Sequence, residues 1–316
     1  MRKISSEIIV IQFLIGLLAL INFSKIPESD LLNYYNYYSS VQPALGIRNF
    51  ILPINWYGFE PFWVVLVMLG KSFGFTAKVF HLIIFYFSYS LIFQALQLIG
   101  GRSKGFYIFL SLYLFQPYLF SVSFHLFRQL FAVSMMVYLL ARIEKNTNII
   151  LTLPVLIHSS SIIVAVSSIK FRIWHLILFF ILGVSMFFLA PEISNLLVSK
   201  INPNTSHDLG LINIKEIVLY IISSILAIYV LTFETKKILR IISTSLIILL
   251  FFVIIFRSNS ELIKRLVFHL YLLTPFLLIS IHNKTGLNIA KIILPLMAIF
   301  FVYHFIFINP WKYGLY

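Results

Sequence analysis

Long, uninterrupted apolar runs constrain this chain more than any other feature of its sequence. They occupy residues 8–23, 79–99, 173–190, 241–256 and 289–308. A helix needs about 20 mostly apolar residues to cross the hydrocarbon core of a bilayer. Charged residues make up only 11% of the chain, whereas a soluble domain has about 25%. Because the runs are continuous and do not alternate with period two, they predict transmembrane helices and not a barrel.

We therefore expect an all-α, polytopic transmembrane bundle that forms one domain over residues 1–316. About ten or eleven membrane segments are predicted. They start near residues 8, 60, 79, 105, 124, 148, 173, 213, 241, 266 and 289. Residues 1–23 resemble a signal peptide, but no small-residue cleavage site follows, so we expect an uncleaved first helix. Polar loops are predicted over residues 24–58 and 191–215.

The basic residues test this topology. The formal net charge is +14, but Lys and Arg gather at the ends of apolar runs, as the positive-inside rule expects, so nucleic acid is not implied as a partner. If all basic loops are cytoplasmic, an even number of crossings must separate each loop from the next. Two of the intervals between basic loops contain an odd number of predicted segments. Re-entrant segments over residues 60–75 and 148–168, the second broken near residues 158–161, would resolve this. The alternative is that the chain violates the charge rule.

Three ionisable residues and two tyrosines are candidates for handling a sugar. Asp30 precedes the spaced tyrosines Tyr34 and Tyr37, and a carboxylate among aromatic rings can bind sugar hydroxyls while the rings stack on the sugar. Glu60 begins an apolar run and could act as a general base or orient one. His158 could accept a proton from a sugar hydroxyl near neutral pH. Each ionisable residue has a structural alternative: a helix cap for Asp30, a helix-dipole carboxylate for Glu60, and helix packing for His158.

A second group of residues could bind an anionic headgroup such as a pyrophosphate. Arg128 lies within an apolar helix, where a guanidinium is costly unless it is paired or wetted, and Gln129 is a neighbouring donor. Arg257 and Arg265 lie at the predicted outer face, with Tyr271 further along as a sugar contact. Alternatively, Arg128 pairs with a carboxylate and the other two cations are interfacial anchors. The remaining histidines, among them one at position 81, are interpreted as structural. Cysteine is absent, which excludes thiolate chemistry.

Four motifs in order resemble those of the EpsG/Wzy-type bacterial polysaccharide polymerases. They are Asp30 with its spaced tyrosines, Glu60-Pro61-Phe62-Trp63, Arg128-Gln129-Leu130-Phe131-Ala132 and His158-Ser159-Ser160. The resemblance covers residues 25–170, although the family more often has Gly after the proline of the second motif. It implies a multi-pass protein of the bacterial inner membrane, with a bundle resembling the GT-C type of membrane glycosyltransferase.

The resemblance also implies an activity. Such an enzyme moves a growing glycan from undecaprenyl pyrophosphate onto the next undecaprenyl-pyrophosphate-linked oligosaccharide at the periplasmic face, with no cofactor, metal or nucleotide sugar. The product would be O-antigen of lipopolysaccharide, capsule or exopolysaccharide. Membrane lipid and a chain-length regulator are the expected partners. Arg128, Arg257 and Arg265 would stabilise the leaving pyrophosphate, Glu60 or His158 would act as the base, and the carboxylate at position 30 would orient the acceptor.

Two other functions stay open. A GT-C glycosyltransferase that uses a polyprenyl-phosphate sugar would carry an acidic motif like Glu28-Ser29-Asp30, add one sugar and usually need a divalent metal. A flippase or transporter of lipid-linked glycans would move its substrate unchanged. The absence of an obvious internal repeat argues against a transporter.

Overall fold

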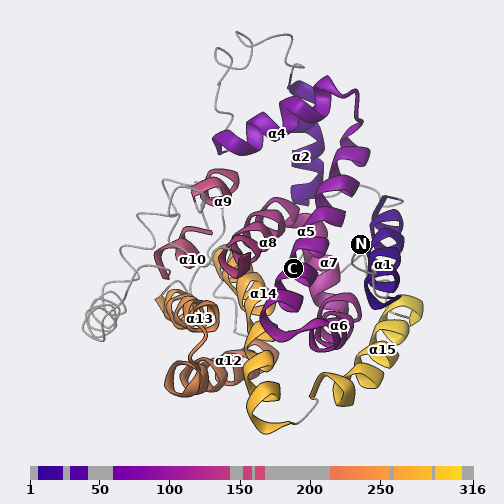
Figure 1. Ribbon diagram of the computed structural model, residues 1–316. Helices are drawn as coiled ribbons and strands as arrows, with labels where there is room; N and C mark the ends of the chain where they lie inside the picture. Colours follow the sequence, from indigo (N-terminus) through magenta and orange to yellow (C-terminus); the bar gives the residue numbers. More distant parts are fainter. Residues whose placement is uncertain are drawn as a thin grey trace. The chain divides into compact units, whose positions relative to one another are not determined.

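Every element in the described part of the chain is a helix. A computed structural model describes residues 6–23, 29–41, 60–142, 152–158, 161–167, 214–255, 260–286 and 289–307. The elements, labelled as in Figure 1, are α1 Ser6–Phe23, α2 Ser29–Ser40, α4 Pro61–Ser72, α5 Ala77–Gly100, α6 Arg102–Phe109, the π-helix η1 Leu110–Leu114, α7 Pro117–His125, α8 Phe127–Arg142, α9 Thr152–Ile157, α10 Ile162–Ser167, α12 Ile214–Phe233, α13 Lys237–Ile255, α14 Ser260–Thr285 and α15 Ile289–Phe307. The predicted all-α class is confirmed, and the resemblance to GT-C enzymes stays a prediction.

Contacts within the chain divide it into two units, which we describe separately. Unit 1 comprises Met1–Ala165 and His282–Tyr316, and unit 2 comprises Val166–Ile281. The single domain expected from the sequence stays a prediction.

The predicted apolar segments coincide with helices wherever the structure describes them, and the segment expected near residue 173 lies outside the described residues. The break predicted near residues 158–161 is confirmed, because α9 ends at Ile157 and α10 begins at Ile162. Helix α4 has 12 residues, which at about 1.5 Å per residue falls short of the roughly 30 Å hydrocarbon core. This length is consistent with the predicted re-entrant segment, which stays a prediction.

Two of the described helices, Ala77–Gly100 and Ile263–Thr285, are long and apolar enough to cross a membrane. A third candidate span consists of Arg102–Leu114 and Pro117–His125, which are bent by 74° relative to each other. Separate segments were predicted near residues 105 and 124, and this bend was not predicted. At the bend, the Gln116 side chain accepts a hydrogen bond from the Leu119 backbone N–H. These apolar helices make the chain a membrane protein.

Helix α2 lies within residues 24–58, which the sequence analysis predicts to be a polar loop. This prediction was wrong for residues 29–40, which are helical. Leu31, Tyr38 and Val41 are buried, and their spacing places them along one face of a helix. The tyrosines that make the stretch look polar are therefore part of an apolar face.

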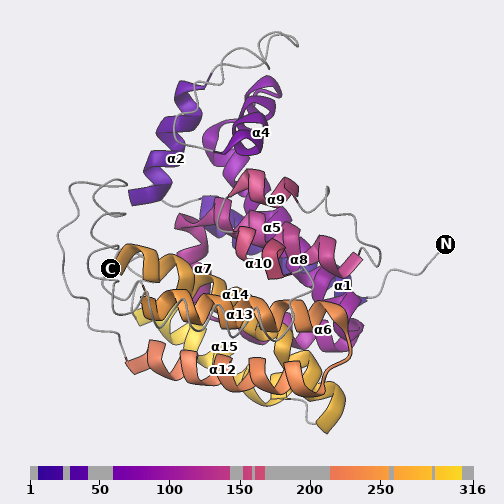
Figure 2. The same ribbon diagram turned by 90° about the vertical axis from the view of Figure 1, so that its left-hand side faces the viewer.

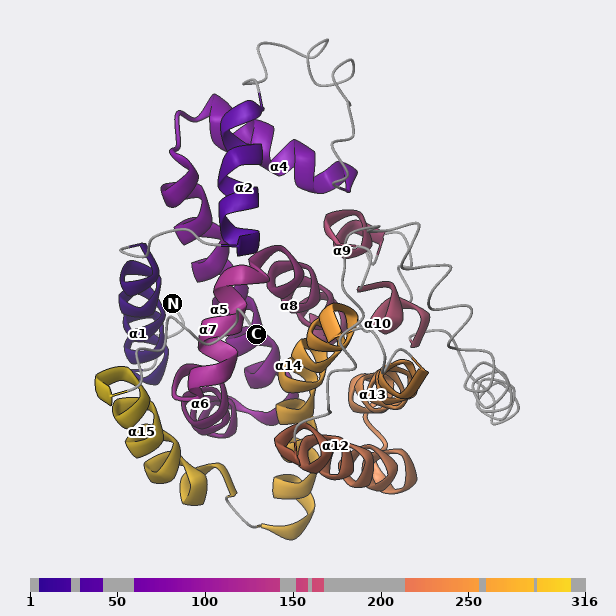
Figure 3. The same ribbon diagram turned by 180° about the vertical axis from the view of Figure 1, so that it is seen from behind.

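In unit 1, helix α5 contacts α1, α6 and α8, and α9 contacts both α4 and α8. Helices α2 and α4 lie side by side in Figures 1 and 2. Their buried side chains form one hydrophobic cluster with Phe127 of α8 and Ile157 of α9. Helix α15 runs beside η1 and α6 (Figure 3). The cluster also includes Phe80 and Ile84 of α5 and therefore brings together five helices.

In unit 2, helices α12 and α13 run side by side (Figure 2). The Ser243 hydroxyl of α13 donates to the Ala227 carbonyl of α12 at 2.5 Å. Between the two helices, the Glu234 carboxylate accepts hydrogen bonds from the backbone N–H groups of residues 235 and 236. Hydroxyls of Ser223 and Thr274 join α12 to α14 at 2.9 Å. Short polar side chains thus hold apolar helices together, as is common in membrane bundles.

Candidate functional site

A largely buried ion pair joins the beginning of α4 to the beginning of α8. Arg128 Nη1 donates to Glu60 Oε2 at 2.6 Å. The side chains are only 10% and 19% exposed, respectively. Charged groups withdrawn from water are tolerated when they pair with good geometry, and removing one of them leaves an uncompensated charge. In this structure, Arg128 therefore pairs with a carboxylate, as the alternative interpretation of this residue expects.

The local sequence explains how Glu60 reaches this position. Pro61 is the first residue of α4 and Glu60 is its N-cap, with extended backbone angles of φ −67° and ψ 147°. Its side chain makes no capping hydrogen bond; its Oε2 instead accepts from Arg128. A carboxylate beside a helix N-terminus is also favoured by the helix dipole. Proline thus fixes where α4 begins, and the dipole and the guanidinium together hold the carboxylate.

Tyr34 of α2 contacts the guanidinium side of this pair. The guanidinium carbon of Arg128 lies 5.6 Å from the centroid of the Tyr34 ring, within the range of a cation–π interaction. The same ring packs edge-on against Phe127, with centroids 4.8 Å apart, and against Trp63 at 6.4 Å. Tyr34 therefore connects the ion pair to the aromatic side chains of α2, α4 and α8.

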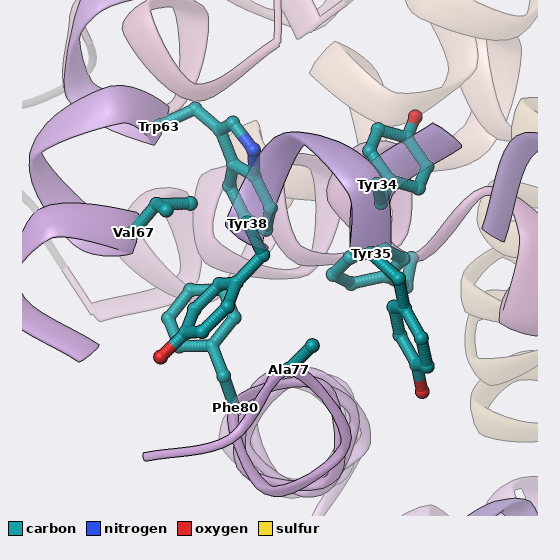
Figure 4. A pocket seen from close by; sticks show the side chains of 8 residues that line it. Tyr34, Tyr35, Tyr38, Trp63, Val67, Ala77 and Phe80 are labelled. Atoms are coloured by element: carbon teal, nitrogen blue, oxygen red, sulfur yellow. The ribbon is translucent and has the colours of Figure 1, made fainter. Parts of the chain in front are cut away.

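These side chains enclose a pocket beside the ion pair, which we call the aromatic pocket (Figure 4). It is lined by Tyr34, Tyr35, Tyr38, Trp63, Val67, Ala77, Phe80 and Phe127. Its empty volume is about 220 Å³, including the part that opens to solvent. Its walls are almost entirely apolar, so a polar ligand group could enter only by bonding to the few polar atoms at the wall.

Two tyrosine hydroxyls of the aromatic pocket are already engaged. The Tyr35 hydroxyl lies 3.1 Å from Nδ1 of His81, and the Tyr38 hydroxyl donates to the Phe75 carbonyl at 2.8 Å. Burial raises the pKa of Tyr35 from 10.0 to about 12, so its hydroxyl stays protonated near neutral pH. The imidazole of His81 is buried and its ring lies 4.4 Å from that of Phe127, between centroids.

Trp63, Tyr35 and His81 contribute to the site but were not predicted from the sequence as site residues. His81 was interpreted as a lone structural residue, but it bonds to a side chain of the pocket wall. Aromatic residues make up 17% of the chain, so composition could not single out those that line a pocket. The available signal was the proximity of Trp63 to Glu60, since residues three apart share a helix face.

Two further predicted residues, Gln129 and His158, are buried in unit 1 near the ion pair. Gln129 follows Arg128 in α8 and is buried. His158 is also buried and follows α9, which contacts both α4 and α8. Its carbonyl accepts from the Ser161 backbone N–H at 3.1 Å and from the Ser161 hydroxyl at 2.9 Å. His158 thus lies at a helix break next to the two helices that carry the ion pair.

The other predicted residues belong to the hydrophobic cluster, to unit 2, or to parts outside the described residues. Tyr37 is buried in the hydrophobic cluster of α2 and α4. Asp30 belongs to the first turn of α2, and its side chain lies outside the described residues. Arg265 and Tyr271 belong to α14 in unit 2, and Arg257 lies outside the described residues. Within the described ranges, no three His, Asp or Glu side chains are grouped so that they could hold a metal ion.

The site combines a cation that can bind phosphate, a carboxylate that can accept a proton and rings that can stack on a sugar. Fold and site together define a helical membrane protein with a buried ion pair beside an aromatic pocket. The family model described as the EpsG family matches residues 8–315, and the chain belongs to the EpsG family. The resemblance inferred from the four motifs is thereby confirmed, and it points to polysaccharide polymerases as the general class. No curated protein and no solved structure matches the chain.

Proposed function

We propose that this protein polymerises lipid-linked oligosaccharide repeat units. The growing glycan would be transferred from undecaprenyl pyrophosphate to the next undecaprenyl-pyrophosphate-linked repeat, at the periplasmic face of a bacterial inner membrane that the chain crosses several times. Membership of the EpsG family supports the general class. The observation that supports the chemistry is the contact between Arg128 and Glu60 beside the aromatic pocket.

The ion pair suggests how the site would change when substrate binds. In the resting state the Glu60 carboxylate forms an ion pair with the Arg128 guanidinium. A pyrophosphate offers the guanidinium several oxygens in a geometry suited to paired hydrogen bonds. It would therefore compete with the carboxylate for Arg128. To accept a proton, the displaced Glu60 carboxylate would have to come within hydrogen-bond reach of the acceptor hydroxyl.

The transfer then proceeds without further reagents. The bond between the anomeric carbon and the pyrophosphate oxygen breaks, and its electron pair stays on that oxygen. The acceptor hydroxyl oxygen forms the new bond to the anomeric carbon, and its proton passes to Glu60 and later to water. Arg128 stabilises the charge that grows on the leaving pyrophosphate, so it binds the transition state more strongly than the ground state.

The remaining predicted residues have supporting roles in this proposal. Gln129 would donate to the pyrophosphate beside Arg128. His158 is the alternative base, because it lies next to the helices that carry the pair. Further roles are proposed for five other residues: sugar binding for Asp30, Tyr34 and Tyr271, and pyrophosphate binding for Arg257 and Arg265. Tyr37 is less suited to touching a sugar, because its side chain is only 7% exposed.

The decisive experiment removes the gene from its host and restores it with variants. The host's own lipid-linked glycans are then separated by size. Wild type should restore a ladder of lengths, while Arg128→Ala and Glu60→Ala should leave single repeats on the lipid. Arg128→Lys keeps the charge but loses the planar fork, so we expect short or sparse ladders. Full-length polymer from Arg128→Ala and Glu60→Ala, with normal protein levels, would remove both residues from the mechanism.

The same assay separates the competing functions. A GT-C glycosyltransferase would give one added sugar in place of a ladder, and a chelator would usually abolish its activity. A flippase would leave the lipid-linked repeat chemically intact while moving it across the bilayer. His158→Gln decides between the two bases: loss of the ladder with this variant and its retention with Glu60→Gln would assign the base to His158.

A further inference from the structure

Three lysines gather where α6 meets the end of α14 and the beginning of α15, and all three belong to unit 1. Lys104 Nζ of α6 donates to Asn283 Oδ1 in the last turn of α14. Lys291 Nζ of α15 lies 4.6 Å from the centroid of the Tyr107 ring, within the range of a cation–π interaction. Lys104 and Tyr107 are three residues apart and so share a face of α6. Lys284, which directly follows Asn283, is exposed and is the third member of what we call the lysine cluster.

The positive charge of the lysine cluster is not balanced by acidic residues in the same stretches of sequence. No Asp or Glu lies between residues 60 and 144 or after residue 261, and these stretches contain α5, α6 and α15. Like charges held close together repel one another, and more strongly where the surroundings are poorly polarisable. An ammonium group has three N–H donors, so Lys104 can hold Asn283 and an anion at the same time. The lysine cluster is therefore suited to binding an anion.

An exposed apolar face of α15 begins beside the lysine cluster. Ile292, Leu296, Ile299 and Tyr303 are each at least 50% exposed, and their spacing of four, three and four residues places them along one face of the helix. Helix α15 packs against η1 and α6 (Figure 3). At 1.5 Å per residue the exposed face is about 16 Å long, which is about half of the hydrocarbon core of a bilayer. The cations therefore lie at one end of an apolar face that is one lipid leaflet long.

We propose that the lysine cluster and this face of α15 bind one anionic phospholipid of the bilayer. The headgroup phosphate accepts from the three ammonium groups, and an acyl chain lies along Ile292, Leu296 and Ile299. Basic groups between membrane helices are a general means of holding anionic headgroups. A soluble anion would leave the apolar face uncovered, and a zwitterionic lipid carries a cation that the lysines repel. The inference does not depend on the proposed polymerase activity.

Native mass spectrometry of the full-length protein in a neutral detergent measures the binding of single lipids. Dioleoyl phosphatidylglycerol and dioleoyl phosphatidylcholine have the same acyl chains, so the ratio of their Kd values isolates the contribution of the headgroup. Each lysine near an anionic headgroup contributes a factor of about five, so we expect phosphatidylglycerol to bind at least about tenfold more tightly. Equal Kd values would overturn the proposal. Displacement of phosphatidylglycerol by an equal concentration of glycerol 3-phosphate would assign the lysines to a soluble phosphate and would also overturn it.

A charge-matched pair of variants tests whether the preference belongs to this cluster. The first variant replaces the three clustered lysines, as Lys104→Gln, Lys284→Gln and Lys291→Gln, and should lose most of the preference for phosphatidylglycerol. The matched control removes three exposed cations around the beginning of α13, as Lys236→Gln, Lys237→Gln and Arg240→Gln. The control should keep the wild-type preference, since it loses the same charge at a different place. An equal loss in both variants would mean that overall charge, and not the lysine cluster, selects the lipid.

A second measurement leaves the lysines in place and provides a test if the first variant does not fold. The photoreactive amino acid benzoylphenylalanine replaces Leu296 on the proposed lipid face or, in a separate protein, the similarly exposed Ile225 of α12. Each protein is illuminated in vesicles of equal parts phosphatidylglycerol and phosphatidylcholine. Position 296 should cross-link mainly phosphatidylglycerol, and position 225 should cross-link both lipids equally. The same lipid ratio at the two positions contradicts the proposal.

Discussion

Arg128 Nη1 lies 2.6 Å from Glu60 Oε2, although the two residues are 68 positions apart in the sequence. The pair forms where α4 and α8 begin, and both helices contact α9. The proposed chemistry gives the two groups separate roles: the guanidinium binds phosphate and the carboxylate accepts a proton. In the proposed mechanism, this contact keeps both charges compensated until the pyrophosphate of the substrate displaces the carboxylate.

The first prediction concerns the structural contribution of this pair. Removing one partner of a buried ion pair costs roughly 3 to 5 kcal/mol, and the partial exposure of both side chains places this pair toward the lower end. Arg128→Ala and Glu60→Ala should each lower the melting temperature in detergent. The exchange variant Glu60→Arg with Arg128→Glu should recover most of that stability, since it restores opposite charges at the same positions.

Activity should not follow stability in the exchange variant. The carboxylate would then lie in α8 and the guanidinium at the start of α4, so the pyrophosphate and the acceptor hydroxyl would each meet the wrong group. We expect a stable protein that produces no ladder. A ladder of normal length from the exchange variant would mean that the pair is purely structural, as the alternative interpretation of Arg128 holds.

Much of the fold could be predicted from the sequence. Apolar runs long enough to cross a bilayer identify helices whatever their neighbours are, so α5 and the other apolar helices were expected. The break after α9 was expected because polar residues interrupt an apolar run there. Helix α2 was expected only through the alternative interpretation of Asp30 as a helix cap, since Tyr, Asn and Ser residues make the stretch look polar while Tyr38 is buried. The π-helix η1 carries no periodic signal. The bend before α7 had a local signal in Pro117, the first residue of α7, because proline disfavours a continuous helix through the preceding residue.

The site was predictable only in part, for a similar physical reason. A guanidinium in an apolar helix and a carboxylate at the start of another are rare, so Arg128 and Glu60 could be selected one by one. Their mutual contact depends on how α4 packs near α8, which one sequence does not reveal. The chain has 33 Phe, 17 Tyr and 4 Trp residues, and only its spacing of three residues from Glu60 separates Trp63 from the others. The combinations that define the site are therefore tertiary.

The second prediction concerns Tyr34 and its contact with Arg128. Tyr34→Phe keeps a ring beneath the guanidinium, whereas Tyr34→Leu removes the cation–π interaction, worth about 0.5 to 2 kcal/mol. We expect the Leu variant to melt at a lower temperature than the Phe variant. The difference should shrink in an Arg128→Ala background. If it persists there unchanged, the ring contributes through its packing against Phe127 and Trp63 and not through the cation.

The third prediction concerns Gly70, which allows two helices to approach at the pocket wall. A Cβ atom at this position would lie 2.6 Å from Phe80 Cδ2 and 3.1 Å from the Tyr38 hydroxyl. Gly70→Ala should therefore displace the Phe80 ring, at a cost of about 1 to 3 kcal/mol for overpacking. A melting curve measures the cost, and adding Phe80→Leu should reduce it because the clashing ring atom is removed.

Gly16→Ala is the matched control for this substitution. Gly16 lies within α1, and a Cβ atom there would meet nothing within 4 Å. Alanine in a helix interior is favoured over glycine by roughly 0.5 to 1 kcal/mol, so this variant should be neutral or slightly more stable. Equal melting temperatures for the Gly70 and Gly16 variants would contradict the close approach at the pocket wall.

The last prediction concerns the contact between Tyr35 and His81. Tyr35→Phe leaves the buried ring nitrogen of His81 without this hydroxyl, which should cost about 1 to 3 kcal/mol, and adding His81→Leu should recover part of it.

The pKa of Tyr35 is raised by burial from 10.0 to about 12. The folded protein therefore holds this proton more tightly than the unfolded chain does. Its contribution to stability is complete below pH 10 and is lost as pH rises through about 12. Melting curves at about pH 8 and pH 11 should show a larger loss for wild type than for Tyr35→Phe. Parallel losses in the two proteins would show that Tyr35 does not titrate in this way.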